Sequence, residues 1–166
     1  MTTIIKHTDK AASDTKQTDK NKDVLINMLS QADQLTLPEG FENSKSWKRA
    51  QQSTKIVGSR NPGQWQISLL RPNGNIGGDY FVTFCLQSHE HEHESHILAD
   101  CSCKAYEFRD ICCHVLYFWW QFCQHNILVY DIQTREYHQS PPQNLNLREF
   151  QPDQEQEKKQ KQEVAA

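Results

Sequence analysis

The sequence predicts a small α+β domain that needs a staple to be stable. An alternating segment, 65–69, and an apolar strand-like segment, 80–86, flank a turn rich in Gly and Pro and predict an antiparallel β-hairpin. Residues 112–125 are apolar almost all round, which predicts a buried helix. Because only 36% of the 166 residues are hydrophobic, we expect the six cysteines to support a small core.

The two ends of the chain are predicted to lie outside this domain. Residues 1–22 are rich in Lys, Asp, Thr and Gln, without a sustained apolar period, and indicate a disordered tail. Residues 151–166 form a charged, Gln-rich segment that we expect to be solvated. A short helical segment is predicted over 23–37, ending near Pro38 and Gly40. The main domain is therefore expected to span 41–130.

Further elements follow in order along this domain. Asn43 or Ser44 can cap a helix that carries Trp47, and residues 54–57 are expected to form a short strand. After the hairpin, an extended path over 97–99 is predicted to lead into Cys101. The segment 127–130 follows the apolar helix and is expected to add a strand or a turn against the same core.

Four residues have the spacing of a metal site. Cys101 and Cys103 are two apart, and so are Cys112 and His114, with eight residues between the pairs. On an extended segment such residues face the same side, and the second pair can converge only where a loop becomes a helix. Thiolate and imidazole are the ligands that Zn²⁺ prefers in a tetrahedron. The residues therefore predict a zinc site, at the place where a small domain needs a staple.

The expected compartment agrees with metal binding rather than disulfides. The N-terminal residues contain only the apolar pair Ile4 and Ile5 before charges begin, which is too short for a secretory signal. We therefore expect an intracellular location, cytoplasmic or nuclear, where thiols stay reduced. No apolar stretch is long enough to predict a membrane span, and we expect no membrane partner.

The pattern C-x-C-x(8)-C-x-H resembles the SWIM zinc finger, and the similarity extends roughly over 41–130. Tyr106 is similar to the aromatic residue in the loop of that family. The resemblance implies one structural Zn²⁺ held in a zinc knuckle, and an adaptor that binds DNA or protein without chemistry of its own. Two departures are Ile111, where the family often has proline, and Cys113, which leaves open an exchange of Cys113 for Cys112 as ligand.

Charge gives two interpretations of the partner. A net charge of −3 argues against a protein that coats nucleic acid, and together with the aromatic helix it favours a protein partner. The stretch 41–80 is nevertheless basic, whereas the zinc region is acidic. If the domain binds DNA, the contacts are expected from that stretch. The candidates are Lys45, Lys48, Arg49, Lys55 and Arg60.

Other functions are less favoured by the sequence. An enzyme would need an open zinc position, and three cysteines with one histidine fill the tetrahedron, so we expect no enzymatic activity and no small-molecule substrate. A thiol-based redox sensor built on Cys112 and Cys113 stays as an alternative. So does a protein-docking subunit that contacts no nucleic acid, with the apolar helix as its docking face.

The remaining His and Cys residues have ordinary interpretations. Histidine and glutamate alternate over 89–96, and we expect a solvated loop there rather than a second metal site. Cys85 and Cys123 have apolar neighbours and are expected to be small core residues. His125, near the end of the apolar helix, is expected to cap it.

Overall fold

A five-stranded antiparallel sheet forms the centre of the molecule. The computed structural model describes residues 11–52, 55–69, 74–88 and 94–149. The strand order is β1-β6-β5-β4-β3, and every neighbouring pair is antiparallel. The strands are β1 (Asp33–Gln34), β3 (Lys55–Asn61), β4 (Gln64–Leu69), β5 (Tyr80–Ser88) and β6 (Ser95–Cys101). The α+β class is confirmed, and the predicted hairpin is the pairing of β4 with β5.

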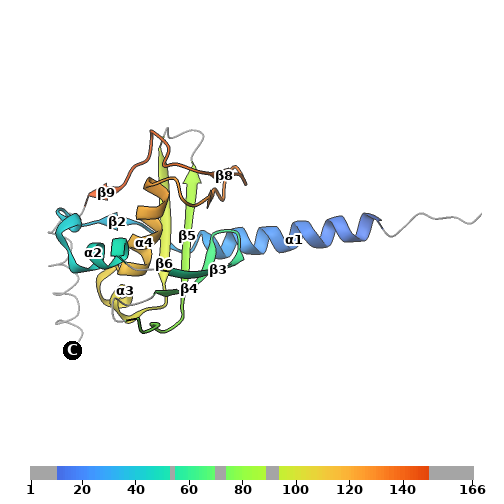
Figure 1. Ribbon diagram of the computed structural model, residues 1–166. Coiled ribbons are helices and arrows are strands. Elements are labelled where there is room, and N and C mark those ends of the chain that lie inside the picture. The colour runs from blue at the N-terminus through green and yellow to red at the C-terminus, as the bar shows by residue number, and fades with distance from the viewer. Residues whose placement is uncertain (1–10, 53–54, 70–73, 89–93, 150–166) are drawn as a thin grey trace, which may run out of the picture.

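The described residues form four α-helices and one 3-10 helix besides the sheet. They are α1 (Ala11–Leu29), η1 (Phe41–Asn43), α2 (Lys45–Gln52), α3 (Lys104–Arg109) and α4 (Cys113–Cys123). Figure 1 shows α2, α3 and α4 together on one side of the molecule, whereas α1 projects away from the opposite side. Ser44 begins α2 as predicted, because its Oγ accepts a hydrogen bond from the Trp47 amide at 3.0 Å.

The main core lies between α4 and one face of the sheet. Alternate residues of β5, such as Val82 and Phe84, are buried on this face. Phe118 of α4 packs at ring-centroid distances of 5.2 Å from Trp65 and 5.8 Å from Phe84. The predicted apolar helix is therefore the centre of the core, which explains its apolar character on nearly every side.

A second, smaller core lies on the other face of the sheet. Leu29, at the end of α1, packs there with Cys85, Leu98 and Ile132, all buried. The turn between β3 and β4 packs against this second core. Gly63 has a φ of 73°, and an added Cβ would lie 3.1 Å from the Cβ of Cys85. Only glycine combines that backbone conformation with so close an approach.

The N-terminal boundary differs from the prediction. The helix begins at Ala11, so residues 11–22, which the sequence placed in a disordered tail, are helical. The segment contains neither Pro nor Gly, and a helix anchored at Leu29 can continue outward through polar residues. The helix also ends earlier than Pro38, because residues 33–34 pair with β6 as β1 and residues 36–37 form β2 (Thr36–Leu37). Residues 1–10 lie outside the described residues.

The packed body continues past residue 130. The predicted apolar segment forms β7 (Val129–Tyr130), which pairs with β8 (Tyr137–His138). Between them the buried Asp131 carboxylate accepts hydrogen bonds from the Ser88 hydroxyl and the Gln133 amide. The last described strand, β9 (Arg148–Glu149), runs parallel to β2. The predicted tail over 151–166 lies outside the described residues.

None of the described helices combines the length and the apolar character that crossing a membrane requires. The His- and Glu-rich run is described only in part, since residues 89–93 lie outside. Its last residues, from Ser95, belong to β6 and pair with the end of β5. The strand therefore starts two residues earlier than the sequence predicted, because backbone pairing with β5 overrides the polar composition.

Candidate metal centre

The first pair of cysteines leaves the sheet in an extended conformation. Cys101 ends β6, and Cys103 precedes α3 with φ −85° and ψ 147°. Ser102 between them is exposed and exchanges hydrogen bonds with Phe81, whose amide donates to its Oγ at 3.0 Å. Both cysteines are buried on the side that faces α4. The alternation predicted from the C-x-C spacing is confirmed.

The second pair lies at the start of α4. Cys112 is the N-cap, with φ −147° and ψ 168°, and its Sγ accepts a hydrogen bond from the Val115 amide at 3.4 Å. His114 is the second residue of the helix. The pair thus stands where loop becomes helix, as the spacing requires. The cluster of potential ligands in the described residues contains Cys112 and leaves out Cys113.

Residues between the two pairs form a helix rather than a simple loop. Tyr106 of α3 is buried, and its hydroxyl donates to the Ala99 carbonyl of β6 at 2.7 Å. Asp110 ends the helix with a φ of 54°, and its backbone amide donates a hydrogen bond to the Tyr106 carbonyl at 2.8 Å. This short helix turns the chain back so that Cys112 reaches Cys103.

The four ligand atoms converge on one point. The sulfur atoms of the three cysteines and one imidazole nitrogen all lie within 4.8 Å of one another. The Cys101 Sγ is 3.7 Å from the His114 Nδ1. A tetrahedron with Zn–S near 2.3 Å and Zn–N near 2.0 Å has S–N edges of about 3.5 Å, so the arrangement fits a metal ion. The four residues are Cys101, Cys103, Cys112 and His114.

Burial closes the cluster to water. Cys112 is fully buried, and His114, the most exposed of the four, keeps 8% of its surface. The Tyr80 ring covers the imidazole at a centroid distance of 4.4 Å. Low exposure of all four side chains is typical of structural metal sites.

Electrostatics explain why the cluster suits a cation. Hydrogen bonding with Cys101 and burial raise the pKa of Cys112 well above its usual range, and burial raises that of Cys103. Burial, followed by the charge of Arg49, lowers the pKa of His114 to about 4. Without a cation the Cys103 and Cys112 thiols and the His114 imidazole are thus uncharged near pH 7, and a bound dication would stabilise the thiolates that ligate it.

Cys113 has different surroundings. Its thiol is half-buried, and burial followed by the neighbouring Cys112 raises its pKa to about 11, although Arg49 acts in the opposite direction. A thiol with a raised pKa is a poor nucleophile near pH 7. These surroundings weaken the alternative of a redox sensor.

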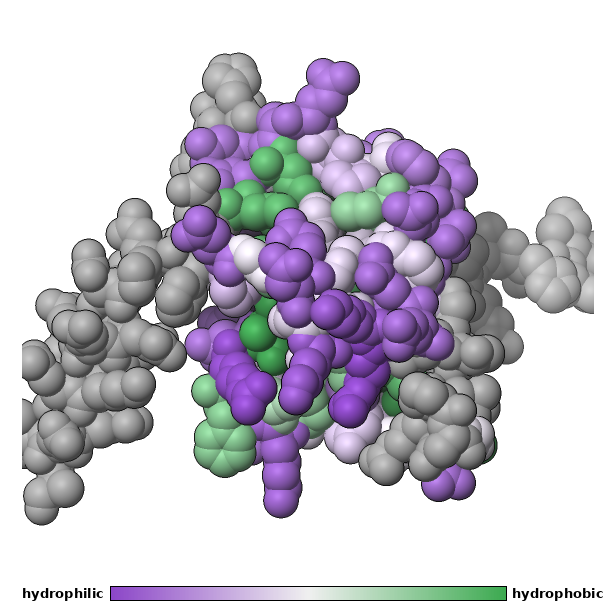
Figure 2. All heavy atoms as spheres, turned by 60° about the vertical axis from the view of Figure 1, so that its left-hand side comes forward, coloured by the Kyte–Doolittle hydropathy of each residue, from purple (hydrophilic) through white to green (hydrophobic). Residues whose placement is uncertain are grey.

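The candidate nucleic-acid residues come together only in part. Lys45, Lys48 and Arg49 are spaced to share one face of α2, and all three are exposed. Figure 2 shows that the most hydrophilic side chains gather on the lower half of this side of the molecule, at the level of α2 and α3. Arg60 lies elsewhere, with its guanidinium 4.9 Å from the centroid of the Phe81 ring. Lys55 begins β3, and its side chain is outside the described ones.

The helix α4 and the cysteines outside the cluster differ in how deeply they are buried. The apolar helix does not offer a docking face, because eight of its eleven residues are buried and the other three, Cys113, Trp120 and Cys123, are half-buried. Cys85 is a core residue whose pKa burial raises to about 12, whereas Cys123 is only half-buried. His125 follows α4 with a φ of 59°.

Comparisons with protein families, with curated proteins and with solved structures each find no match for this chain. The site therefore has to be interpreted from its own geometry. What sequence reasoning missed is the supporting set around the ligands, namely α3 and the Tyr80 ring. The aromatic residue at position 106 was the one available signal for α3, since a buried Tyr needs a hydrogen-bond partner.

Proposed function

We propose that this chain is a SWIM-type module in which Cys101, Cys103, Cys112 and His114 hold one structural Zn²⁺. The observation that carries the proposal is the convergence of the four buried ligand atoms within 4.8 Å. Three thiolates and one imidazole form a complete ligand set for zinc. The ion would fix the end of β6 to the first turn of α4, which joins the sheet to the main core.

The proposed role of the metal is structural, and the chain is proposed not to be an enzyme. A catalytic zinc keeps a position for water or substrate, whereas these four ligands fill the tetrahedron. Free thiols and thiolate ligands both persist in a reducing compartment, which supports an intracellular location.

Purification without chelator is expected to give about one zinc per chain, measured by elemental analysis. Cys101→Ser and His114→Ala should each lower the zinc content. Cys123→Ser is the matched control, because that thiol is outside the cluster. Zinc content far below one, or equal loss in the control, would refute the proposed site.

We further propose that the module acts as an adaptor whose binding surface is the basic face of α2, with DNA as the partner. Lys45 and Lys48 are exposed there, and α2 packs against the helix that carries His114. A salt titration of DNA binding tests this. If both lysines contact phosphates, Lys45→Gln with Lys48→Gln should reduce the slope of log K against log salt by about 2.

Lys20→Gln with Lys22→Gln is the matched control for this titration. These lysines are exposed on α1, on the opposite side of the molecule from α2 (Figure 1). An unchanged slope in the α2 variant, or the same change in both variants, would exclude the α2 face as the DNA surface.

A protein partner is the second candidate, and one side chain favours it. Phe108 on α3 is 78% exposed, although it sits between the two ligand pairs. Exposed aromatic residues on a rigid element are typical anchors of protein interfaces. Phe108→Ser should abolish capture of such a partner while leaving zinc content and DNA binding unchanged.

A further inference from the structure

The basic face of α2 lies close to the point where the described chain ends. β9 closes the described residues at Glu149 and is paired with Leu37 of β2. Lys45, the first residue of α2, is only eight positions along the chain from Leu37. A segment of eight residues after Glu149 can therefore span the same gap, since the two contour lengths are equal.

The segment that follows Glu149 has the charge that complements α2. Its first eight residues, 150–157, contain three carboxylates and no basic side chain. The carboxylates alternate with Gln, so an extended backbone would present all three on one side. They are Asp153, Glu155 and Glu157. The basic residues of this tail begin only afterwards, at Lys158.

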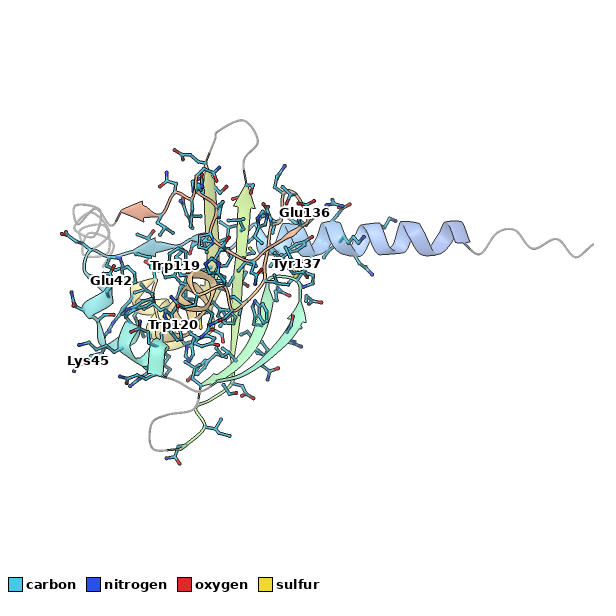
Figure 3. The ribbon with its side chains drawn as sticks, turned by 45° about the horizontal axis from the view of Figure 1, so that its top comes forward. Glu42, Lys45, Trp119, Trp120, Glu136 and Tyr137 are labelled. Carbon is cyan, nitrogen blue, oxygen red and sulfur yellow. The ribbon has the colours of Figure 1, made fainter. Side chains whose placement is uncertain are left out.

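The α2 face has cations that the described residues leave available. Lys45 and Lys48 are exposed, and neither takes part in an ion pair between described residues. The acid next to them, Glu42 in η1, lies on the same outer side as Lys45 in Figure 3 but forms no ion pair with it among these residues.

We infer that the acidic segment 153–157 docks on the basic face of α2 within the same chain. The tether keeps these carboxylates near Lys45 and Lys48, and opposite charges at that distance attract each other most strongly at low salt. The occupant of this face in the isolated protein is thus the chain's own C-terminal segment, and a polyanionic partner would have to displace it.

Zero-length carbodiimide cross-linking of the full-length, zinc-loaded protein tests the contact directly. Isopeptide bonds are expected between the carboxylates of 153–157 and the amines of Lys45 and Lys48, and they should disappear at high salt. A mixture of ¹⁵N-labelled and unlabelled chains distinguishes links within a chain from links between chains. Links mainly between chains, or links that are as frequent to Lys20 and Lys22 of α1, would overturn the inference.

Two variants make the result independent of cross-linking chemistry. In Asp153→Asn with Glu155→Gln and Glu157→Gln, the amide resonances of α2 should shift while those of α1 stay unchanged. Absence of both the links and the shifts would overturn the inference. That this contact limits DNA binding rests on the proposed function, and the same triple variant should then bind DNA several-fold more tightly. If the links form but no variant binds DNA, the contact stands and DNA is removed as the partner.

Discussion

The two faces of the central sheet are held together in different ways. On one face, α4 joins a large aromatic core to the four-residue cluster at its first turn. On the other, α1 is attached through Leu29 and its few neighbours, together with an exposed ion pair between Arg135 and Asp23 at 3.2 Å. Exposed ion pairs contribute about 0 to 1 kcal/mol. A metal ion held by this cluster would therefore act on the face that carries most of the core, whereas the α1 face depends on few apolar contacts.

Removal of the metal is expected to have the largest effect. Structural zinc can contribute on the order of 10 kcal/mol, so chelation should unfold the α4 face. Near-UV circular dichroism would report the loss of packing around Trp65, Phe118 and Tyr80. A spectrum that stays unchanged after verified metal loss would show that apolar packing alone holds this face.

Zinc binding should also release protons. Because their raised pKa values keep the Cys103 and Cys112 thiols protonated near pH 7, ligation must displace at least two protons per ion. Zinc affinity should therefore decrease as the pH falls. Calorimetry in buffers of different ionisation enthalpy counts the protons, and a count near zero would exclude these thiols as ligands.

Leu29→Ala tests the opposite face. Truncation of this fully buried side chain is expected to cost about 2 to 5 kcal/mol and to loosen α1, with zinc content retained. Chemical denaturation and hydrogen exchange would measure the two effects. Val24→Ala is the matched control, because Val24 is 60% exposed on the same helix. Loss of zinc in the Leu29 variant would mean that the two faces are coupled.

Asp131→Ala should have a smaller effect on the same side. The change leaves the Gln133 amide and the Ser88 hydroxyl without their buried acceptor, which costs about 1 to 3 kcal/mol. Urea denaturation gives the magnitude. Gln133→Ala, an exposed change that keeps the amide, should be near neutral. Equal destabilisation by both would locate the effect in the turn rather than in the carboxylate.

The smallest expected effect is that of Ser44→Ala on the metal side. Loss of the hydrogen bond to the Trp47 amide should cost about 1 kcal/mol. Ser44→Asp should restore the stability, since aspartate caps helices equally well. A thermal melt compares the three proteins, and no rescue by aspartate would assign the loss to packing instead of capping.

The features that could be predicted from the sequence are those encoded by local periodicity. The C-x-C alternation, the Ser44 cap and the hairpin all depend on neighbouring residues, and the structure has them. The α3 helix has six residues, too few for a period to be recognised. The strands β1 and β9 have two residues each and exist through pairing with β6 and β2, which are distant in sequence.

The fate of the basic residues shows the same limit. Lys45, Lys48 and Arg49 share one helix face, which their spacing of three and four residues indicates. Arg60 was grouped with them by composition alone, but the sheet carries it to Phe81 on a different surface. The apolar composition of α4 likewise could not tell a helix buried in the core from one that docks a partner, because it does not say what covers the apolar residues.

The parallel pairing of β2 with β9 has a consequence for modularity. Thr36 and Arg148 are register partners, so the body between them enters and leaves at neighbouring points. A unit with adjacent ends can be inserted into a loop of another protein, or circularly permuted, with little distortion of either partner. An inserted or permuted form would still have to keep β1, Leu35 and Leu29, because β1 pairs with β6 and both leucines are buried in the two cores.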